Sequence, residues 1–283
     1  MKTILIFTIM LGVKTTAAYA QADSSMVRIK LTDGSILIGK IVEKDSSMIV
    51  LTTTAGERSE IPWSTIESAE IVTMGPDGEY SHTDPNISRL LFLPTGRTIT
   101  EGGGYISDYE LVFPSVGVGV TDFLSVGGGL SLIPVFSDEL FYLSAKARIV
   151  HRENIDLSVG YIYGSVPGLN SGSDLSIPYA SMTYGSDRTS LTVAFGDAFG
   201  SSSTGALVIG GETQISKSAA LLSENWLTLK GSVFSFGLRI FGEILAADFG
   251  LIVPISVSAL RDFPVIPWFA FAYNWGTGKT VSY

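Results

Sequence analysis

The chain contains no cysteine and only two histidines, and charged residues make up 16% of its 283 residues. Without cysteine, a disulfide framework and a thiolate metal site are excluded, and the separated His82 and His151 predict no metal site. Low charge together with a mean hydropathy of +0.36 is the opposite of a disordered composition. A formal net charge of −9 disfavours binding to nucleic acid. The composition therefore predicts a folded, apolar protein with no cofactor and no nucleic-acid partner.

A long apolar helix is also missing, although the chain begins with a short apolar stretch. Residues 4–13 are largely apolar but far shorter than the roughly 20 residues that cross a bilayer. Lys2 precedes them and Ala18-Tyr19-Ala20 follows as a small-x-small cleavage site, which predicts a secretory signal peptide over residues 1–20. A buried N-terminal helix is the alternative. Export would leave a mature chain with a net charge of −11.

The remaining sequence divides into two regions of different composition. Residues 21–85 hold 11 acidic and 5 basic residues, a net charge of −6, whereas residues 86–283 hold 16 acidic and 11 basic residues, a net charge of −5. The change coincides with a turn-rich stretch that runs from Gly75-Pro76 to Pro85-Asn86. We therefore expect a small domain over residues 21–75, a linker over 76–87 and a larger domain over 88–283.

The small region has the pattern of short β-strands. Val27, Ile29 and Leu31 alternate with charged residues, and Asp33-Gly34 is a hairpin turn signal. The run resembles the Sm-like small barrels of SH3 type through Asp33-Gly34, Gly39-Lys40-Ile41, Asp45, Ile49-Val50-Leu51, Gly56, Ile61-Pro62 and Ile66. The RNA binding of that family does not carry over, because Ser46 and Ser47 stand where the family has Asn. The region is then either a module that binds a protein partner or a stabilising cap.

The large region alternates apolar and polar residues with a period of two. In residues 233–241, for example, Phe234, Phe236, Leu238 and Ile240 share one face, and small residues with Arg239 share the other. Similar alternation over about ten residues recurs, which is typical of transmembrane β-strands. A soluble β-sandwich also alternates, but its polar face normally carries Lys, Glu and Thr rather than Gly, Ser and Ala. Residues 244–259 could be read as a membrane helix, yet Gly250 and Pro254 disfavour it.

Eleven such segments are visible, and the connections between them set the expected topology. They are 103–120, 124–133, 139–150, 155–166, 177–186, 189–200, 204–216, 219–229, 231–242, 245–256 and 264–275. Short connections alternate with mostly longer ones, as periplasmic turns alternate with outer loops in outer-membrane barrels. If the short connections are periplasmic, residues 103–120 run toward the periplasm. A strand that runs from the periplasm to the outside must then precede them, and residues 89–95 are the only candidate. This predicts twelve antiparallel transmembrane strands, with ten as the alternative, and a periplasmic small domain.

Several motifs also resemble an uncharacterised family of outer-membrane β-barrels of Gram-negative bacteria. The resemblance is carried by Asp84-Pro85-Asn86, Arg89-Leu90-Leu91-Phe92, Pro94-Thr95-Gly96-Arg97, Gly103-Gly104-Tyr105, Tyr109, Gly127-Gly128-Gly129 and Ser223-Glu224-Asn225-Trp226. It covers roughly residues 84–275. It implies an outer-membrane barrel fold, with outer-membrane lipid and the barrel assembly machinery as partners, and it implies no activity.

The few charges of the barrel are the candidate functional residues. Strand parity predicts that nine of them face the lumen: Asp108, Glu110, Lys146, Arg148, Asp156, Glu212, Glu224, Arg239 and Asp248. Arg or Lys on the lipid face would cost about 2–4 kcal/mol at the bilayer midplane. The nine charges form either a salt-bridge network that fills a narrow lumen or a lining that selects solutes.

Three functions remain open on the sequence alone. The first is a narrow channel or transport-related component with a periplasmic interaction domain. The second is a structural or adhesion-type protein whose lumen is closed by its own charges. The third is an enzyme acting on envelope lipids, but neither histidine has a Ser or Asp partner at a recognisable spacing, so we expect no catalytic residue. A lipid-hydrolysis activity that His151→Ala leaves unchanged would contradict this third hypothesis.

Overall fold

The computed structural model describes residues 26–74, 80–132, 140–165, 174–199, 204–255 and 264–276. Within these ranges the chain is all β, apart from one 3-10 turn, η1 (Trp63–Thr65). No helix of these ranges is long and apolar enough to span a membrane. The chain divides into two compact units between Ala69 and Glu70. The signal peptide predicted for residues 1–20 lies outside the described residues.

The N-terminal sheet consists of six short antiparallel strands. They are β1 (Met26–Leu31), β2 (Ile36–Lys44), β3 (Met48–Thr53), β4 (Arg58–Pro62), β5 (Ile66–Met74) and β6 (Tyr80–Ser81), in the order β4-β3-β2-β1-β5-β6. The apolar residues of the alternating pattern form its core, in which Ile29, Ile49 and Leu51 are fully buried. The all-β character of this region follows the sequence pattern, whereas its likeness to Sm-type barrels remains a prediction.

Two turns of this sheet are closed by aspartates. The carboxylate of Asp45 accepts hydrogen bonds from the backbone N–H of Ser47 (2.6 Å) and of Met48 (2.9 Å). The carboxylate of Asp33 accepts one from the N–H of Ser35 (2.8 Å). These hydrogen bonds, chiefly those from the backbone of Ser47 and Ser35, hold the pKa of both carboxyl groups below their usual value. Ser47, which interrupts the Sm-like pattern, therefore helps to close a turn.

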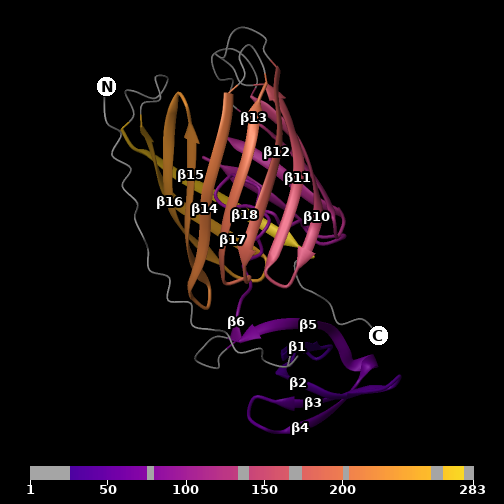
Figure 1. Ribbon diagram of the computed structural model, residues 1–283. Helices are drawn as coiled ribbons and strands as arrows, with labels where there is room; N and C mark the ends of the chain where they lie inside the picture. Colours follow the sequence, from indigo (N-terminus) through magenta and orange to yellow (C-terminus); the bar gives the residue numbers. More distant parts are fainter. Residues whose placement is uncertain are drawn as a thin grey trace. The chain divides into compact units, whose positions relative to one another are not determined.

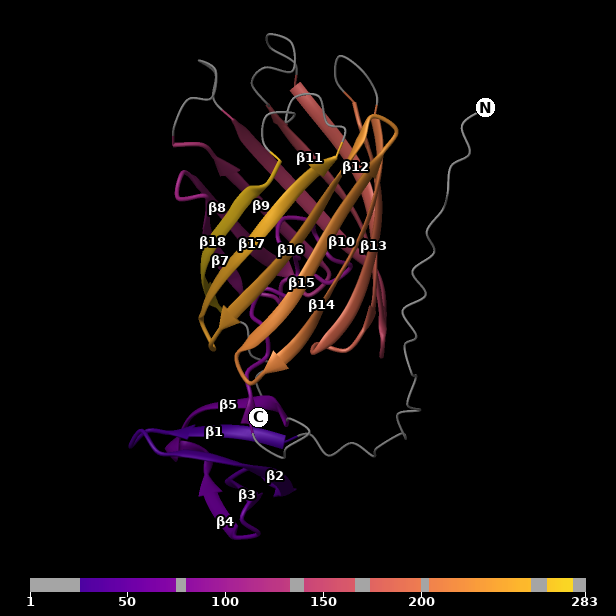
Figure 2. The same ribbon diagram turned by 90° about the vertical axis from the view of Figure 1, so that its left-hand side faces the viewer.

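Twelve strands form a closed antiparallel barrel (Figures 1 and 2). They are β7 (Gly104–Tyr109), β8 (Phe113–Thr121), β9 (Leu124–Leu130), β10 (Phe141–Arg152), β11 (Ile155–Ser165), β12 (Asp174–Gly185), β13 (Thr189–Ala198), β14 (Thr204–Ser216), β15 (Ala219–Thr228), β16 (Gly231–Phe241), β17 (Leu245–Ile255) and β18 (Ile266–Trp275). Consecutive strands pair with each other, and β18 pairs with β7 to close the barrel. The predicted fold class and the number of strands are confirmed.

The two faces of the barrel wall differ as the alternation predicts. In β16 the side chains of Phe236 and Ile240 are exposed on the outer face, whereas Ser235 and Arg239 are buried on the inner face. Large apolar side chains are exposed on the outer face of most strands, for example Leu143, Phe195, Leu221, Leu251 and Phe271. Soluble proteins rarely expose an apolar surface this extensive, so the outer face has the composition of a surface that contacts lipid.

The connections at one end of the barrel are all short. Only two or three residues join β8 to β9, β10 to β11, β12 to β13, β14 to β15 and β16 to β17. The chain enters β7 and leaves β18 at this same end. The longer predicted loops, 134–138, 167–176, 201–203 and 258–262, fall mostly outside the described residues.

The prediction that residues 103–120 form one strand was wrong. The chain reverses at Glu110 and Leu111, which both adopt positive φ (54° and 62°), and β7 and β8 pair as a hairpin. Glu110 N–H donates to the carbonyl of Phe269 (2.9 Å), and Val112 N–H donates to that of Tyr109 (3.2 Å). Because left-handed conformations of non-glycine residues are uncommon, nothing in the local sequence marks this turn.

The prediction that residues 89–95 form a barrel strand was also wrong. These residues fold into a compact loop. The N–H of Thr95 donates to the carbonyl of Ser88 (3.0 Å), and the N–H of Leu90 donates to the carbonyl of Leu93 (2.9 Å). Residues 82–103, here named the luminal segment, lie inside the barrel (Figure 2). The twelfth strand therefore comes from the division of 103–120 and not from this segment.

Candidate functional site in the barrel lumen

The luminal segment and the inner face of the wall are joined by a network of buried polar side chains. Asp84, Asn86, Arg89 and Arg97 of the segment are all buried, although the sequence analysis placed Asp84 and Asn86 in a linker. The three charged residues among them each contact a residue of the wall or its turns at least 88 positions away in the chain. This site therefore depends on the closure of the barrel.

Arg239 of β16 lies at the centre of this network. Its guanidinium is fully buried and forms a fork with Asp248 of β17, from Nε to Oδ1 (2.6 Å) and from Nη2 to Oδ2 (2.9 Å). Its Nη1 donates to Asp84 Oδ2 (2.6 Å), and its Nη2 also donates to the carbonyl of Leu90 (2.7 Å). Because a guanidinium presents five donors in one plane, one side chain ties two wall strands to two points of the luminal segment.

Arg89 adds a second cation to the same network from the opposite side. Its Nη1 donates to Asp248 Oδ2 (3.1 Å) and to the carbonyl of Leu91 (2.9 Å), and its guanidinium carbon lies 5.4 Å from the ring centroid of Tyr109. Glu212 approaches Arg239 at 3.9 Å. Two arginines thus face three acidic side chains in a buried site, where removal of either arginine leaves buried carboxylates uncompensated.

Lys146 and Glu224 hold the backbone of the luminal segment rather than its side chains. Nζ of Lys146 donates to the carbonyls of Ser88 (2.9 Å), Thr95 (3.2 Å) and Arg97. One carboxylate oxygen of Glu224 accepts the N–H of both Phe92 and Leu93 (2.9 Å each), and its other oxygen accepts the indole N–H of Trp226 (2.7 Å). A loop inside a lumen has no sheet partner, so these side chains supply the hydrogen bonds that its backbone needs.

A second cluster of charges lies around Asp156 of β11, near the short connections. Arg97 Nε (3.5 Å), Arg148 Nη1 (3.6 Å) and His151 Nδ1 (2.7 Å) all approach its carboxylate. Arg97 also donates to the carbonyl of Ser186 (2.8 Å), which fixes the luminal segment to the turn after β12. Asp156 therefore contacts two guanidinium groups and one imidazole, and the imidazole of His151 is largely exposed at the edge of this cluster.

Seven of the nine predicted charges lie on the inner face, where they form several groups. Glu212, Arg239 and Asp248 meet around the guanidinium, whereas Glu224 contacts Phe92, Leu93 and Trp226. Arg148 and Asp156 belong to the second cluster, and Lys146 lies between the two groups on the luminal backbone.

The other two predicted charges lie at the β7–β8 turn. Asp108 shares the outer face of β7 with the exposed Ile106, opposite the buried Ser107 and Tyr109, so the predicted inward orientation was wrong. Its carboxylate instead accepts the N–H of Phe113 (3.0 Å) across the hairpin. Glu110 lies in the turn itself and accepts the N–H of Phe269 (3.0 Å). The unrecognised turn explains the position of Glu110.

Sequence reasoning missed the three charged residues of the luminal segment that meet the wall: Asp84, Arg89 and Arg97. One signal was available, because residues 90–93 are four consecutive apolar residues that end at Pro94. A barrel strand alternates and keeps its N–H groups for pairing, so this run fits a packed loop better than a strand. Among the described residues, no group of three or more His, Asp or Glu side chains is arranged to hold a metal ion.

Comparisons with known proteins add a likeness of low identity to solved barrels. No family model and no curated protein matches the chain. A KdgM porin in complex with disordered oligogalacturonate is 8% identical, with a TM-score of 0.49 over 61% of this chain and 98% of that one. An OmpT loop-deletion mutant, an outer membrane protein of Vibrio cholerae, is 12% identical, with a TM-score of 0.32 over 89% and 97%. The closed twelve-stranded barrel follows from the strand pairing itself.

Proposed function

We propose that the protein is an outer-membrane β-barrel that carries a small solute, and that the luminal segment closes its lumen at rest. The observation that carries this proposal is the attachment of the segment by side chains that are themselves buried in the wall, above all Arg239, Lys146 and Glu224. A lumen filled by wall side chains alone could not open, whereas a segment held by discrete hydrogen bonds and ion pairs can be displaced as a unit.

The membrane location is supported by the barrel's own surface. Only helices and closed barrels satisfy all their backbone groups within a bilayer, and this barrel is closed and has an apolar outer face. Both ends of the barrel chain lie with the short connections, which face the periplasm in outer-membrane barrels. On this basis we place the N-terminal sheet in the periplasm, where it could bind a protein partner.

A permanently closed barrel with a structural or adhesion role is the second candidate. It is favoured by the ion pairing around Arg239, which leaves that guanidinium no contact with water. The two candidates differ in one measurable property, because a displaceable segment predicts transient ion conduction and a permanent one predicts none.

Lys146→Met tests this difference. Methionine has a similar length but cannot donate to the three carbonyls of the luminal segment, and a charged hydrogen-bond donor contributes about 1.5–3 kcal/mol. In planar bilayers we expect the full-length wild-type protein to conduct ions only rarely. The fraction of time that the variant spends in a conducting state should be at least about tenfold larger.

The matched control is Lys230→Met, which removes an exposed ammonium that donates to the hydroxyl of Thr204 (3.0 Å) and does not contact the luminal segment in any described hydrogen bond. Its conductance should equal that of the wild type. If Lys146→Met stays silent while its unheated form still migrates as a folded barrel, the segment is not a displaceable closure and the structural role is favoured instead.

A further inference from the structure

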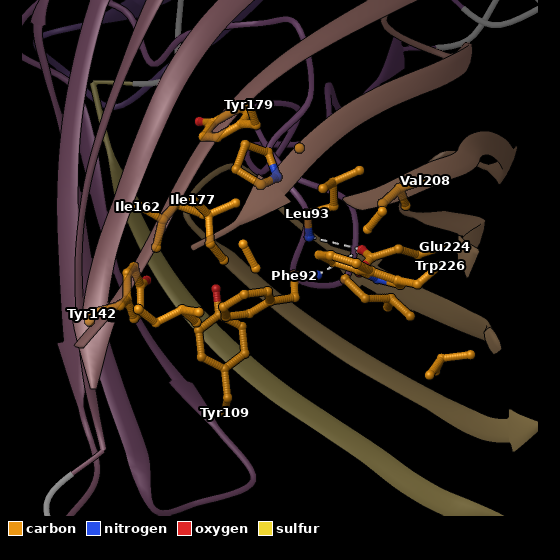
Figure 3. A pocket seen from close by; sticks show the side chains of 18 of the residues that line it. Phe92, Leu93, Tyr109, Tyr142, Ile162, Ile177, Tyr179, Val208, Glu224 and Trp226 are labelled. Carbon is orange, nitrogen blue, oxygen red and sulfur yellow. Dashed lines mark hydrogen bonds between the residues drawn. The ribbon is translucent and has the colours of Figure 1, made fainter. Parts of the chain in front are cut away.

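A cavity of about 580 Å³ lies in the lumen beside the luminal segment (Figure 3). Its floor is formed by Leu91, Phe92 and Leu93 of that segment, and its walls come from the inner faces of most barrel strands. It lies toward the β7–β8 turn and the ends of β9, β11 and β13, away from the short connections. Its volume lies within the roughly 300–1,000 Å³ of small-molecule sites.

The lining of this cavity accepts an uncharged occupant. Its only ionisable acids are Glu110 and Glu224, and no Lys, Arg or His of the described residues lines it. Both oxygens of Glu224 already accept hydrogen bonds from Phe92, Leu93 and Trp226. An anionic ligand would therefore meet no cation here, and burial of a charge without a partner is costly.

Aromatic rings form much of the wall. The rings of Phe113 and Tyr142 are stacked, with centroids 5.9 Å apart and planes inclined by 6°. The ring of Phe92 makes edge-to-face contacts with Tyr109 and Tyr142, at centroid distances of 5.8 and 5.9 Å. Tyr109 continues this group to Trp268, at 5.5 Å. Flat faces in several orientations suit a ligand that itself carries aromatic rings, because ring pairs prefer offset and edge-to-face packing.

Two hydrogen-bond donors of the lining are left without a partner in the described structure. They are the hydroxyl of Tyr179, a residue that is 9% exposed, and the indole N–H of Trp268. Buried polar groups are nearly always paired, and a buried donor without an acceptor costs about 1–3 kcal/mol. Both donor atoms are themselves buried, and the hydroxyl of Tyr179 lies against Gly160 of the wall, so a ligand oxygen pairs with either donor only when that side chain turns toward the cavity. Such a pairing brings no charge into the cavity.

We propose that this cavity binds an uncharged, mainly apolar molecule with aromatic rings and a hydrogen-bond-accepting oxygen, of the aromatic ketone type. The proposal deepens the proposed transport function by naming the class of solute, and it rests on that function only for the step that follows binding. Binding itself requires no conduction, so it can be tested separately from the displacement of the luminal segment.

Photolabelling of the full-length protein with benzophenone tests the site. Benzophenone is an uncharged aromatic ketone that forms covalent bonds with neighbouring C–H groups under ultraviolet light, and peptide mass spectrometry then locates the label. In protein reconstituted into lipid nanodiscs, we expect labels on cavity residues such as Ile162, Ile177 and Val208. Labels confined to outward-facing residues would overturn the proposal, because they would come from probe molecules dissolved in the surrounding lipid.

A filled cavity provides the matched control. Ala206 of β14 lines the cavity, whereas Ala145 of β10 is exposed on the outer face. We expect Ala206→Phe to reduce labelling of the cavity residues at least several-fold, because the new ring occupies the site, and Ala145→Phe to leave it unchanged. Both variants must show the unheated mobility of a folded barrel. Equal labelling in the two folded variants would contradict a site in the cavity.

The role of the unpaired donors is tested by competition between 9-fluorenone and fluorene, which share a skeleton but differ in the carbonyl oxygen. After correction for their partition into lipid, fluorenone should compete about 2- to 10-fold more strongly, as expected for one hydrogen bond. Tyr179→Phe combined with Trp268→Phe should abolish this preference while labelling persists. A preference that survives in this variant would overturn the assignment of the two donors.

If labelling occurs as expected but Lys146→Met never conducts, the site stands and the transport function fails.

Discussion

Replacement of Arg239 by Met is expected to lower the free energy of unfolding of the barrel by about 3–5 kcal/mol, the usual result of breaking a buried ion pair from one side. The substitution leaves Asp84 buried without its cation and Asp248 with Arg89 alone, and it removes the donor to the carbonyl of Leu90. Arg239→Lys should restore little of the loss, because an ammonium cannot reproduce the fork with Asp248. Denaturant unfolding in detergent, followed by loss of the heat-modifiable band, measures the change.

The matched control for this experiment is Arg152→Met, at an exposed position at the end of β10. We expect a change within about 0.5 kcal/mol there, as for most surface substitutions. A variant that combines Arg239→Met with Asp84→Asn should lose less stability than Arg239→Met alone, because Asp84 then carries no uncompensated charge and Asp248 keeps Arg89 as its cation. Equal stability of Arg239→Met and the wild type would show that the network does not hold the luminal segment in the lumen.

Gly96→Val should detach the luminal segment from the wall without opening the barrel. A Cβ atom at position 96 would collide with the carbonyl oxygen of Asp156 and lie 2.9 Å from the amide nitrogen of Thr183, both of which are backbone atoms of the wall. Overpacking of this kind costs about 1–3 kcal/mol. It should also break the hydrogen bonds that Gly96 makes with Thr183 (2.8 Å) and Ser158 (2.6 Å).

Limited digestion with trypsin measures this displacement. Arg97 is buried in the wild type, so cleavage after it should be undetectable in the folded protein and rapid in Gly96→Val. Gly205→Val is the control, since a Cβ at that outward-facing position meets only the ring of Phe195, at 3.7 Å or more. Cleavage after Arg97 at the same slow rate in both folded variants would mean that the close approach of Gly96 does not anchor the segment.

The number of strands was predicted correctly, but one of the predicted strands does not exist. The alternation of β10–β18 is a local property, because neighbouring side chains of a strand point to opposite faces whatever the strand pairs with. The division of residues 103–120 rests on two residues with positive φ. Neither residue is glycine, so turn chemistry gave no warning.

The position of the luminal segment could not be predicted from local sequence patterns. Residues 90–93 carry no alternation, and this was the only sign that they are not a strand. The partners that hold them, Glu224 and Arg239, lie more than 130 residues further along the chain. A charge that faces inward can be predicted from parity, but the group that it meets there cannot.

The sequence by itself determined that this protein is an all-β barrel with an apolar outer face, because a period of two is set by the backbone of each strand alone. Only the tertiary structure decided what occupies the lumen. The contacts of Asp84 with Arg239 and of Lys146 with the carbonyl of Ser88 form when barrel closure brings distant strands around one segment. The cavity above that segment has the same origin, since its floor and its walls come from parts of the chain with no local relation.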